Sequence, residues 1–344
     1  MKAALFREAK RIEIVDRPVP QAGAGEAVVE IALCGICGSD LHGYLTAAMI
    51  PPGTVMGHEC VGTLAEVGQG VKGWTVGDRV AVKPLAECGE CYHCRRGQYS
   101  LCPTGFKRCI GISPAVDGAF ARYLRVAYPD QMLFHLPDEV GFEQGVLVEP
   151  LATSLHAVRS SGFRVGDTTV VIGAGTIGLG VIQFLRVGGA GKIIVVEVSE
   201  AKRRLACSLG ADLALDPAAE GEGLRARVVE ATEGLGAHFV FECAGVPQAV
   251  RSSYTLVRGG GQVLLVGIAD TDVPIEPLLL ALGEVGIKAT LGYWDEFPLV
   301  IDFLRKGRLD VSRMVSRTIP LEQTAEGFDN LLDNKDLVKI AVRP

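Results

Sequence analysis

The chain has 344 residues, of which 48% are apolar and 22% are charged, a composition typical of a globular protein with a large buried core. It excludes extended disorder and a coiled coil, and at ~150 residues per domain the length indicates two domains. Forty acidic and 34 basic side chains leave a net charge of −6, which argues against a protein that binds nucleic acid by neutralising its phosphates.

The N-terminal segment, residues 1–11, has no apolar stretch of the length that a signal peptide needs, so we expect the protein to stay in the cytoplasm. One uncharged run, residues 168–185, just reaches the length of a membrane span. Its glycines, Gly173, Gly175, Gly178 and Gly180, favour a turn followed by a helix instead. We therefore expect no membrane association.

The first 150 residues predict short strands separated by glycine and proline turns. The runs at 27–33 and 60–67 are mostly apolar, and the run at 79–82 follows a Gly77-Asp78 turn. Helical periodicity is scarce here. The pattern indicates an antiparallel, barrel-like first domain.

From about residue 153, strands alternate with helices. The predicted strands are 170–172, 193–196, 239–241 and 263–266, and the predicted helices run from the glycine turn to 187, over 200–209 and over 249–257. Such alternation predicts a doubly wound parallel sheet. A helix at 297–306, the segment 314–319 and a final strand at 338–342 complete the chain, and periodicity alone leaves open which domain they pack against.

Four of the ten cysteines form a C-x2-C-x2-C-x7-C cluster, namely Cys88, Cys91, Cys94 and Cys102. Four thiolates can close a tetrahedral zinc site that leaves no position for water or substrate, so the lobe at residues 86–104 is predicted to hold a structural zinc. Free cysteines and an iron–sulfur cluster are the alternatives. We expect His93, within the cluster, to be a solvated loop residue.

A G-x-G-x-x-G turn follows the predicted strand 170–172 and opens a helix. Gly173 allows the tight turn, Gly175 lets the backbone approach a pyrophosphate, and Gly178 lets the helix pack closely on the strand. The intervening Thr176 and Ile177 begin the helix, whose free N–H groups can receive the phosphate charge. The turn therefore predicts dinucleotide binding.

Glu197 stands nineteen residues after Gly178, at the end of the second predicted strand. A carboxylate there can accept hydrogen bonds from ribose hydroxyls and would repel a 2′-phosphate, which favours NAD over NADP. The basic run that begins at Lys202 keeps NADP open, although a solvated helix face explains the run equally well. We include Lys202 among the candidate cofactor-binding residues.

Metal-ligand residue types occur in three further segments, GICGSDLH, GHE and VEPLA, which contain Cys37, His58, Glu59 and Glu149. Together with the cysteine cluster and the glycine turn, in this order and spacing, they make the whole chain resemble the zinc-dependent medium-chain alcohol dehydrogenases. The segments LVEPLATSLHAV and FECAGVP are most similar to the butanediol dehydrogenase and sorbitol dehydrogenase branch.

The resemblance implies that Cys37 and His58 bind a catalytic zinc, with Glu149 at the position where other members carry a second cysteine. Glu59 is the remaining candidate ligand. Two direct carboxylates would make the site anionic and weaken its Lewis acidity, so we expect one glutamate to bind directly and the other through the exchangeable water. Which of the two binds directly stays open, and both could instead form structural ion pairs.

Further roles follow from the same resemblance. Asp40 is expected to accept a hydrogen bond from a ligand imidazole, or alternatively to be a plain turn residue. Ser39 is expected to take the hydroxyl proton and His42 to pass it to solvent, although His42 could be a surface histidine. The nicotinamide is expected to contact Thr153 and the segment that contains Val266 and Ile268. These positions complete the candidate site.

The resemblance also implies the architecture and activity. A GroES-like β-barrel catalytic domain would comprise residues 1–152 with 292–344, and a Rossmann NAD-binding domain would comprise residues 153–291. The expected enzyme holds two Zn2+ per chain, uses NAD, and oxidises a secondary alcohol or vicinal diol to the ketone. It is expected to be a homodimer or homotetramer.

Several alternatives to this function stay open. Sorbitol or another polyol and L-threonine (3-dehydrogenase activity) are the alternative substrates. Sorbitol dehydrogenases tend to carry an aromatic residue beside the relay histidine, whereas here that position is Gly43 and Tyr44 follows it. A zinc-free reductase of the same fold and a zinc-ribbon protein that binds nucleic acid are less consistent with the motifs.

Overall fold

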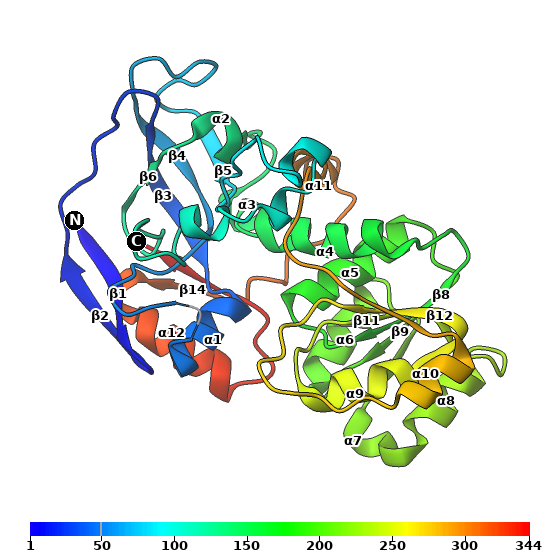
Figure 1. Cartoon of the computed structure of the whole chain (residues 1–344). Helices are drawn as coiled ribbons and strands as arrows, with labels where there is room; N and C mark the ends of the chain where they lie inside the picture. Colours follow the sequence, from blue (N-terminus) through cyan, green and yellow to red (C-terminus); the bar gives the residue numbers. More distant parts are fainter. Residues whose placement is uncertain (49) are drawn as a thin grey trace. The chain divides into compact units, whose positions relative to one another are not determined.

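The computed structural model describes residues 1–48 and 50–344 and divides the chain into two compact units (Figure 1). Unit 1 contains Met1–Glu149 and Tyr293–Pro344, and unit 2 contains Pro150–Gly292. These limits lie a few residues from the domain limits predicted from the sequence. The C-terminal segment, which periodicity could not assign, belongs to unit 1.

Unit 1 is built on a seven-stranded sheet with the order β14-β15-β3-β4-β5-β7, in which β6 also pairs with β3. Every pair is antiparallel except the parallel pair of β14 and β15. The strands are β3 (Ala27–Gly35), β4 (Glu59–Val67), β5 (Arg79–Val82), β6 (Tyr123–Val126), β7 (Leu133–His135), β14 (Arg317–Pro320) and β15 (Ile340–Arg343). The sheet confirms the antiparallel first domain.

Apolar runs and turn chemistry explain these strands. The predicted strands at 27–33 and 60–67 each extend by one or two residues in the structure, and β5 has the predicted limits. Inward-facing residues of β3 and β4, such as Val29, Ile31 and Leu64, join one buried cluster with Phe120 and Phe328. That cluster forms the hydrophobic core of unit 1.

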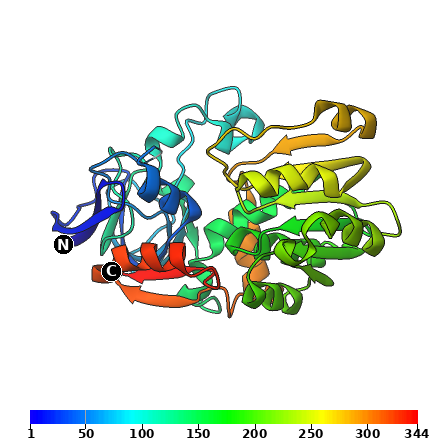
Figure 2. The same cartoon turned by 90° about the horizontal axis from the view of Figure 1, so that it is seen from below.

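The other elements of unit 1 surround this sheet. A separate hairpin joins β1 (Lys2–Glu8) to β2 (Arg11–Asp16), and Figure 2 shows α12 lying on β14 and β15. The helices are α1 (Gly38–Thr46), α2 (Pro129–Met132), α3 (Phe142–Gly145), α11 (Glu296–Arg305) and α12 (Thr324–Asp333), with short 3-10 turns η1 (Cys94–Arg96), η2 (Tyr99–Leu101), η3 (Phe106–Arg108) and η5 (Leu321–Gln323).

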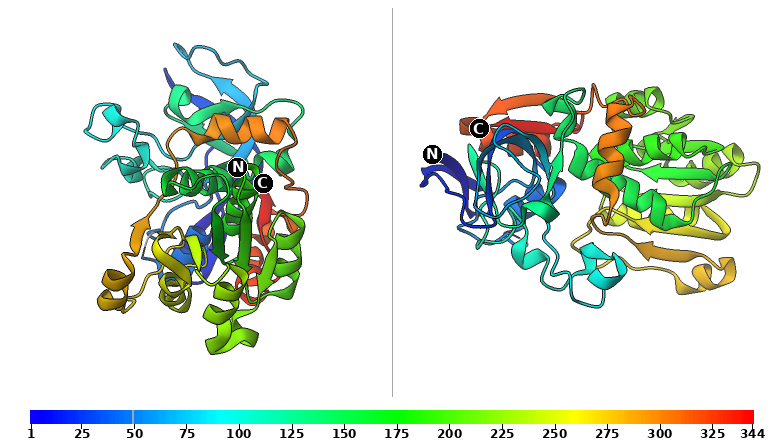
Figure 3. Two further views of the ribbon diagram at one scale, coloured as in Figure 1. Left: turned by 90° about the vertical axis from the view of Figure 1, so that its right-hand side faces the viewer. Right: turned by 90° about the horizontal axis from the view of Figure 1, so that it is seen from above.

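Unit 2 is a six-stranded parallel sheet with the order β10-β9-β8-β11-β12-β13, flanked by helices as the doubly wound prediction requires (Figure 3). The strands are β8 (Thr168–Ile172), β9 (Lys192–Val196), β10 (Leu213–Leu215), β11 (Ala237–Glu242), β12 (Val257–Leu265) and β13 (Gly286–Ala289). The helices are α5 (Thr176–Val187), α6 (Glu200–Ser208), α7 (Pro217–Glu220), α8 (Leu224–Ala231), α9 (Pro247–Leu256) and α10 (Pro277–Gly283), with the 3-10 turn η4 (Gly221–Gly223). Helix α4 (Val148–Ser161) contains the chain position that divides the two units.

The main difference from the prediction concerns β12. The sequence predicted a strand over 263–266, whereas β12 starts at Val257 and ends at Leu265. Three consecutive glycines, Gly259 to Gly261, interrupt its apolar pattern and hid its first half. Within the described residues, no helix is both long enough and apolar enough to span a bilayer.

Candidate active site

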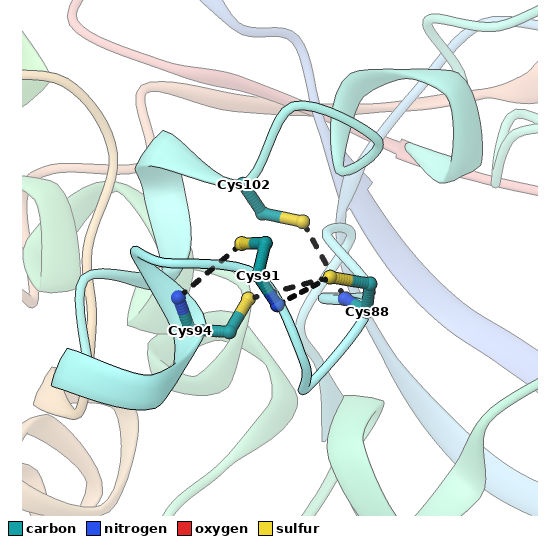
Figure 4. Close-up of side chains that lie close together, drawn as sticks. All are labelled: Cys88, Cys91, Cys94 and Cys102. Carbon is teal, nitrogen blue, oxygen red and sulfur yellow. Dashed lines mark hydrogen bonds between the residues drawn. The ribbon is translucent and has the colours of Figure 1, made fainter.

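The cysteine cluster forms a compact set of four sulfurs in unit 1 (Figure 4). All four sulfur atoms lie within 4.8 Å of one another, and the Sγ atoms of Cys88 and Cys94 are 3.9 Å apart. A tetrahedral zinc with Zn–S bonds of ~2.3 Å requires sulfur separations of about 3.8 Å. Main-chain N–H groups of Cys88, Cys91 and Cys94 each donate to a cluster sulfur at 3.4 Å. The lobe is thus shaped for one tetrahedral ion.

Two neighbouring contacts support this assignment of ligands. Nδ1 of His93 lies 3.0 Å from Gln98 Oε1, so the imidazole forms a hydrogen bond beside the cluster and is not one of the cluster ligands. Burial opposes ionisation of Cys102, but hydrogen bonds from Thr104 and from the Cys88 amide lower the pKa of Cys102 to about 6. A thiolate, the form that binds metal, is therefore accessible at neutral pH.

Three residues of a candidate catalytic centre meet at the start of α1. Cys37 is the N-cap of α1, and its main-chain N–H donates to Oδ2 of Asp40 at 3.0 Å. The other oxygen of Asp40 lies 3.3 Å from Nδ1 of His58, and both side chains are buried. Burial opposes protonation of His58, but the Asp40 carboxylate and the Cys37 sulfur outweigh it and raise the pKa of His58 well above its usual value. One oxygen of Asp40 therefore caps the helix while the other faces the imidazole ring of His58.

Glu59, the next residue after His58, is engaged by a buried lysine. Lys339 Nζ donates to both carboxylate oxygens, at 2.7 and 2.6 Å, and to the carbonyl oxygen of Ile36 at 2.8 Å. Glu59 is 0% exposed and Lys339 is 3% exposed. A Cβ at Gly35 would overlap the Glu59 carboxylate, so this position requires glycine. The ion pair keeps Glu59 turned toward Lys339.

Glu149, the second residue of α4, is partly exposed beside the same centre. Burial raises the pKa of Glu149 to about 7, although the charge of His58 opposes the rise. The hydroxyl of Tyr293 is buried, and burial together with the Glu149 carboxylate raises the pKa of Tyr293 well above its usual value. Cys109, from the loop at 104–117, is also buried here, which raises its pKa to about 12. These interactions place Glu149 near His58 and Cys109.

The two predicted relay residues share one face of α1. Ser39 and His42 are three residues apart in the helix, which places their side chains on neighbouring positions. Ser39 Oγ lies 3.5 Å from His58 Nε2, and both relay residues are partly exposed. The side chains of the predicted catalytic ligands, Cys37, His58, Glu59 and Glu149, do not form a group as compact as the four cysteine sulfurs. Among the described residues, those sulfurs are the one group of metal-ligating side chains that is close enough to hold an ion.

The glycine turn of unit 2 has the geometry that its sequence predicts. Gly173 follows β8 with a φ of 91°, and a Cβ at Gly178 would overlap the carbonyl oxygen of Gly173. Gly175 is the N-cap of α5, and a Cβ there would meet nothing within 4 Å. Thr176 and Ile177 form the first helical residues, so main-chain N–H groups are available above an open space. Thr153 lies partly buried on α4.

Glu197 binds the glycine turn directly. Its carboxylate accepts from the main-chain N–H of Ala174 at 2.7 Å and from that of Ser199 at 2.8 Å. Ser199 is in turn the N-cap that accepts from the N–H of Lys202 at 3.1 Å. Arg203, in the basic run, donates to the carbonyl oxygens of Glu197 and Val198 and pairs with Asp216, so its charge is already engaged.

The segment with Val266 and Ile268 lies at the same end of the sheet. The N–H groups of Val266 and Gly267 donate to the carbonyl oxygen of Glu242, at 2.9 and 2.8 Å. Glu242 Oε1 accepts from the N–H groups of Ala244 and Gly245, and a Cβ at Gly173 would lie 3.0 Å from Ala244. Gly173, Val266 and Ile268 therefore converge through residues 242–245.

Sequence reasoning missed Lys339, Glu242 and Tyr293. Lys339 is a single charge within the apolar run Val338 to Val342, and Glu242 ends the apolar run of β11. A charge inside a buried run needs a partner, so the sequence did carry a signal for both residues. It carried none for Tyr293, because a tyrosine after a loop is unremarkable.

The comparisons with known proteins cover the whole chain. The family models "Alcohol dehydrogenase GroES-like domain" and "Zinc-binding dehydrogenase" match residues 23–138 and 176–306. The (R,R)-butanediol dehydrogenase of Bacillus subtilis is 37% identical over 358 residues, covering 100% of both chains. The sorbitol dehydrogenase of the same organism is 32% identical, covering 100% of this chain and 97% of its own. The crystal structure of a zinc-binding dehydrogenase from Sinorhizobium meliloti bound to NADP superposes with a TM-score of 0.90 at 32% identity, covering 100% of this chain and 99% of that one.

The chain belongs to the zinc-dependent alcohol dehydrogenase family. It is therefore an oxidoreductase that acts on a CH–OH group, with a GroES-like domain and a Rossmann domain. This membership confirms the resemblance stated from the motifs and goes against both the zinc-ribbon and the zinc-free interpretations.

The cysteine lobe yields a prediction about metal content. We expect Cys91→Ser to remove one of two zinc ions per chain, because three sulfurs no longer complete the tetrahedron, and to lower the melting temperature. Elemental analysis of the purified variant and a thermal scan measure both effects. Cys207→Ser, at an exposed cysteine outside the lobe, is the matched control and should keep both ions. Retention of full zinc content by Cys91→Ser would contradict a four-sulfur site.

Proposed function

We propose that this alcohol dehydrogenase uses NAD to oxidise a secondary alcohol or vicinal diol to the ketone, and catalyses the reverse reaction. The observation that carries the proposal is the donor set of a thiol, an imidazole and a carboxylate, from Cys37, His58 and Glu149, with a buried Asp40 behind the imidazole. Similarity over the full length to (R,R)-butanediol dehydrogenase supports the substrate class.

This donor set suits a catalytic zinc. Zinc in catalytic sites takes three nitrogen, sulfur or oxygen donors from the protein and keeps one position open. Asp40 can accept from Nδ1–H of His58, which leaves the lone pair of Nε2 for the metal. When bound, the zinc supplies the Lewis acidity that lowers the pKa of an alcohol hydroxyl.

We assign the third ligand position to Glu149 and a supporting role to Glu59. Both oxygens of Glu59 already accept from the Lys339 ammonium, and breaking a buried ion pair leaves an uncompensated charge that costs about 3–5 kcal/mol. Among the described residues no lysine or arginine forms an ion pair with Glu149, which is partly exposed. The neutral sum of one thiolate, one carboxylate and Zn2+ also favours a single direct glutamate.

The residues of α1 would carry the proton. Ser39 is positioned to accept the hydroxyl proton of the substrate, and His42, one helical turn further on, is positioned to pass it toward solvent. Both side chains are partly exposed, as a route to solvent requires. Asp40, between them in sequence, faces His58 and takes no part in this route.

The neighbourhood of His42 favours a small diol over a long polyol. A side chain at Gly43 would lie 2.8 Å from Ile50, so an aromatic residue at this position does not fit. The following Tyr44 does not replace it, because its hydroxyl lies 3.0 Å from Asp329 Oδ1 and 3.1 Å from the Lys10 carbonyl oxygen, in the core of unit 1, and can donate to either. The aromatic wall expected of a sorbitol-type site is therefore missing from α1.

NAD is the proposed cofactor because Glu197 sits on the glycine turn. Its carboxylate is held against the Ala174 N–H, where it can accept from ribose hydroxyls and repels a 2′-phosphate. Arg203, the residue most able to neutralise such a phosphate, is bound to main-chain carbonyls and Asp216. Ten free cysteines fit a reducing compartment, which supports the cytoplasm as the proposed location.

We further propose that two copies associate through β13, the edge strand of the parallel sheet. Exposed apolar side chains gather on β13 and the adjoining α10, including Leu278 at 69% and Leu282 at 76% exposed. An open strand edge beside such a patch is a pairing surface. A monomeric mass in solution would count against this arrangement, whereas a dimer or tetramer fits it.

The substrate class is tested by a panel. NADH formation should give the highest kcat/KM with butane-2,3-diol, lower values with sorbitol and L-threonine, and none after removal of zinc by a chelator. The absorbance of NADH measures each rate, and readdition of zinc controls for damage by the chelator. A preference for sorbitol or L-threonine would replace the diol assignment and leave the enzyme class unchanged.

The ligand assignment predicts different metal contents for two variants. Glu149→Gln should lose the catalytic zinc, so the content falls from two ions per chain to one and kcat/KM falls at least ~100-fold. The double variant Glu59→Gln with Lys339→Met removes both buried charges together and should keep two ions. Elemental analysis decides, and the opposite pattern would make Glu59 the direct ligand.

The cofactor assignment predicts a shift in preference. Glu197→Gln removes the charge that repels a 2′-phosphate while an amide oxygen can still accept from Ala174, so kcat/KM with NADP should rise about tenfold relative to NAD, which equals about 1.4 kcal/mol. Steady-state kinetics with both cofactors measure the ratio. Glu200→Gln, at an exposed carboxylate three residues further on, at the start of α6, is the control. An unchanged ratio would show that Glu197 does not select the cofactor.

A further inference from the structure

A second cavity lies at the amino ends of the parallel strands of unit 2. Its volume is about 480 Å³, within the ~300–1,000 Å³ range of small-molecule sites. Its walls come from the loop before β8, the first halves of β11 and β12, and the start of β13; the residues used below are Arg164, Asp167, His238, Arg258, Gln262 and Glu284. The glycine turn follows the carboxyl end of β8, so the two places are a strand length of roughly 15 Å apart.

A bulge in β12 shapes this cavity. Ala237 pairs with Val257 and Phe239 pairs with Gln262, so β11 advances by two residues where β12 advances by five. The extra residues include Arg258 and Gly260, and Gly260 has a φ of 69° with open space where a Cβ would stand. Bulges of this kind redirect side chains beside functional sites. Here the bulge brings Arg258 and Gln262 to the cavity wall.

Two arginines, a histidine and a glutamine bring hydrogen-bond donors to the wall of the cavity. Arg258 is partly exposed, but its Nε is buried and has no hydrogen-bond partner among the described residues, which is uncommon for a buried polar atom. His238 Nδ1 accepts from the Thr168 N–H at 3.1 Å, so the ring proton is on Nε2 when the histidine is neutral. Arg164 is exposed at the rim, where it adds a second guanidinium.

Two acidic residues, Asp167 and Glu284, also line the cavity. One oxygen of Asp167 accepts from the main-chain N–H of Arg164 at 2.8 Å, and the other lies 3.6 Å from His238 Nε2. Glu284 is exposed on the opposite rim. Among the described residues, neither Arg164 nor Arg258 forms an ion pair, so an oxyanion in the cavity would meet two guanidinium groups that the carboxylates of Asp167 and Glu284 do not pair with.

We propose that this cavity is a second ligand site, which binds the phosphate or carboxylate group of a small anionic molecule through Arg258, with Gln262 and Arg164 as further donors. The site is separate from the cofactor turn, and the proposal does not depend on the proposed substrate. Because every wall belongs to unit 2, the ligand would bind with or without an alcohol present.

The test measures binding by isothermal titration calorimetry on the intact holoenzyme saturated with NAD+, so that the glycine turn does not compete. Inorganic phosphate and succinate are the two probes, at ionic strength matched with sodium chloride, and they distinguish a phosphate ligand from a carboxylate ligand. Binding of at least one probe is expected. Failure of both to bind would overturn the proposal.

Variants localise the binding. Arg258→Leu should weaken it roughly tenfold or more, whereas Arg251→Leu, at an exposed arginine of the same unit, should not. Arg258→Lys, which keeps the charge, covers the case in which the leucine variant fails to fold, and it should retain part of the affinity. Equal binding by the wild-type protein and both Arg258 variants would overturn the site. Alcohol oxidation measured in parallel reports separately on the proposed function.

Discussion

The constraint on which unit 1 depends is the burial of charge beside the candidate zinc site. Asp40 and Glu59 are both fully buried, and an isolated buried carboxylate is too costly to keep without a partner. Lys339 neutralises Glu59 and comes from the segment just before β15, while Gly35, at the end of β3, leaves room for the carboxylate. In the sheet, β3 lies between β15 and β4. The ion pair between Lys339, just before β15, and Glu59, the first residue of β4, therefore crosses the end of β3 next to His58. The chain next to His58 is thus held by an ion pair between protein side chains.

The candidate ligands all stand at the beginning of a helix or strand. Cys37 caps α1, His58 precedes β4, and Glu149 is the second residue of α4. Each stands where a regular element begins, so its backbone is held by the hydrogen bonds of that element while its side chain is free to face a ligand. Asp40 serves both purposes, because one oxygen satisfies the N–H at the N-cap and the other faces His58. A substitution at Asp40 therefore disturbs the helix and the imidazole together, which makes it a poor residue for separating structure from function.

Local pattern made most of the fold predictable, and spacing made the candidate site predictable. The alternation of apolar runs and turns predicted β5 with its observed limits and α5 to its last residue, because both elements satisfy their own chemistry within a few residues of chain. The cysteine cluster was predictable for the same reason, since its four ligands lie within 15 residues. The partner of Glu59 was not predictable, because Lys339 lies 280 residues away, and a lone charge in an apolar strand indicates that a partner exists without identifying it.

The first half of β12 was hidden because its glycines carry no periodicity and form a bulge. Only the folded chain shows that Glu59, one of the two candidate glutamates, is held by a buried lysine.

Two buried carboxylates lie close to the glycine turn of unit 2, where an anionic cofactor is expected to bind. Glu197 and Glu242 are both buried at the carboxyl ends of strands, close to a turn expected to receive an anionic pyrophosphate. Each uses its carboxylate to hold main-chain N–H groups of a loop, Ala174 and Ser199 for Glu197, and Ala244 and Gly245 for Glu242. Burial raises the pKa of Glu242, and its second oxygen is buried without a hydrogen-bond partner among the described residues. The loops are consequently held in shape before any ligand arrives, and a pyrophosphate would meet backbone N–H groups and the N-terminus of α5 rather than a cluster of basic side chains. Such a site selects its ligand by shape and by the direction of its N–H groups, which explains how a chain with a net charge of −6 can bind a dinucleotide.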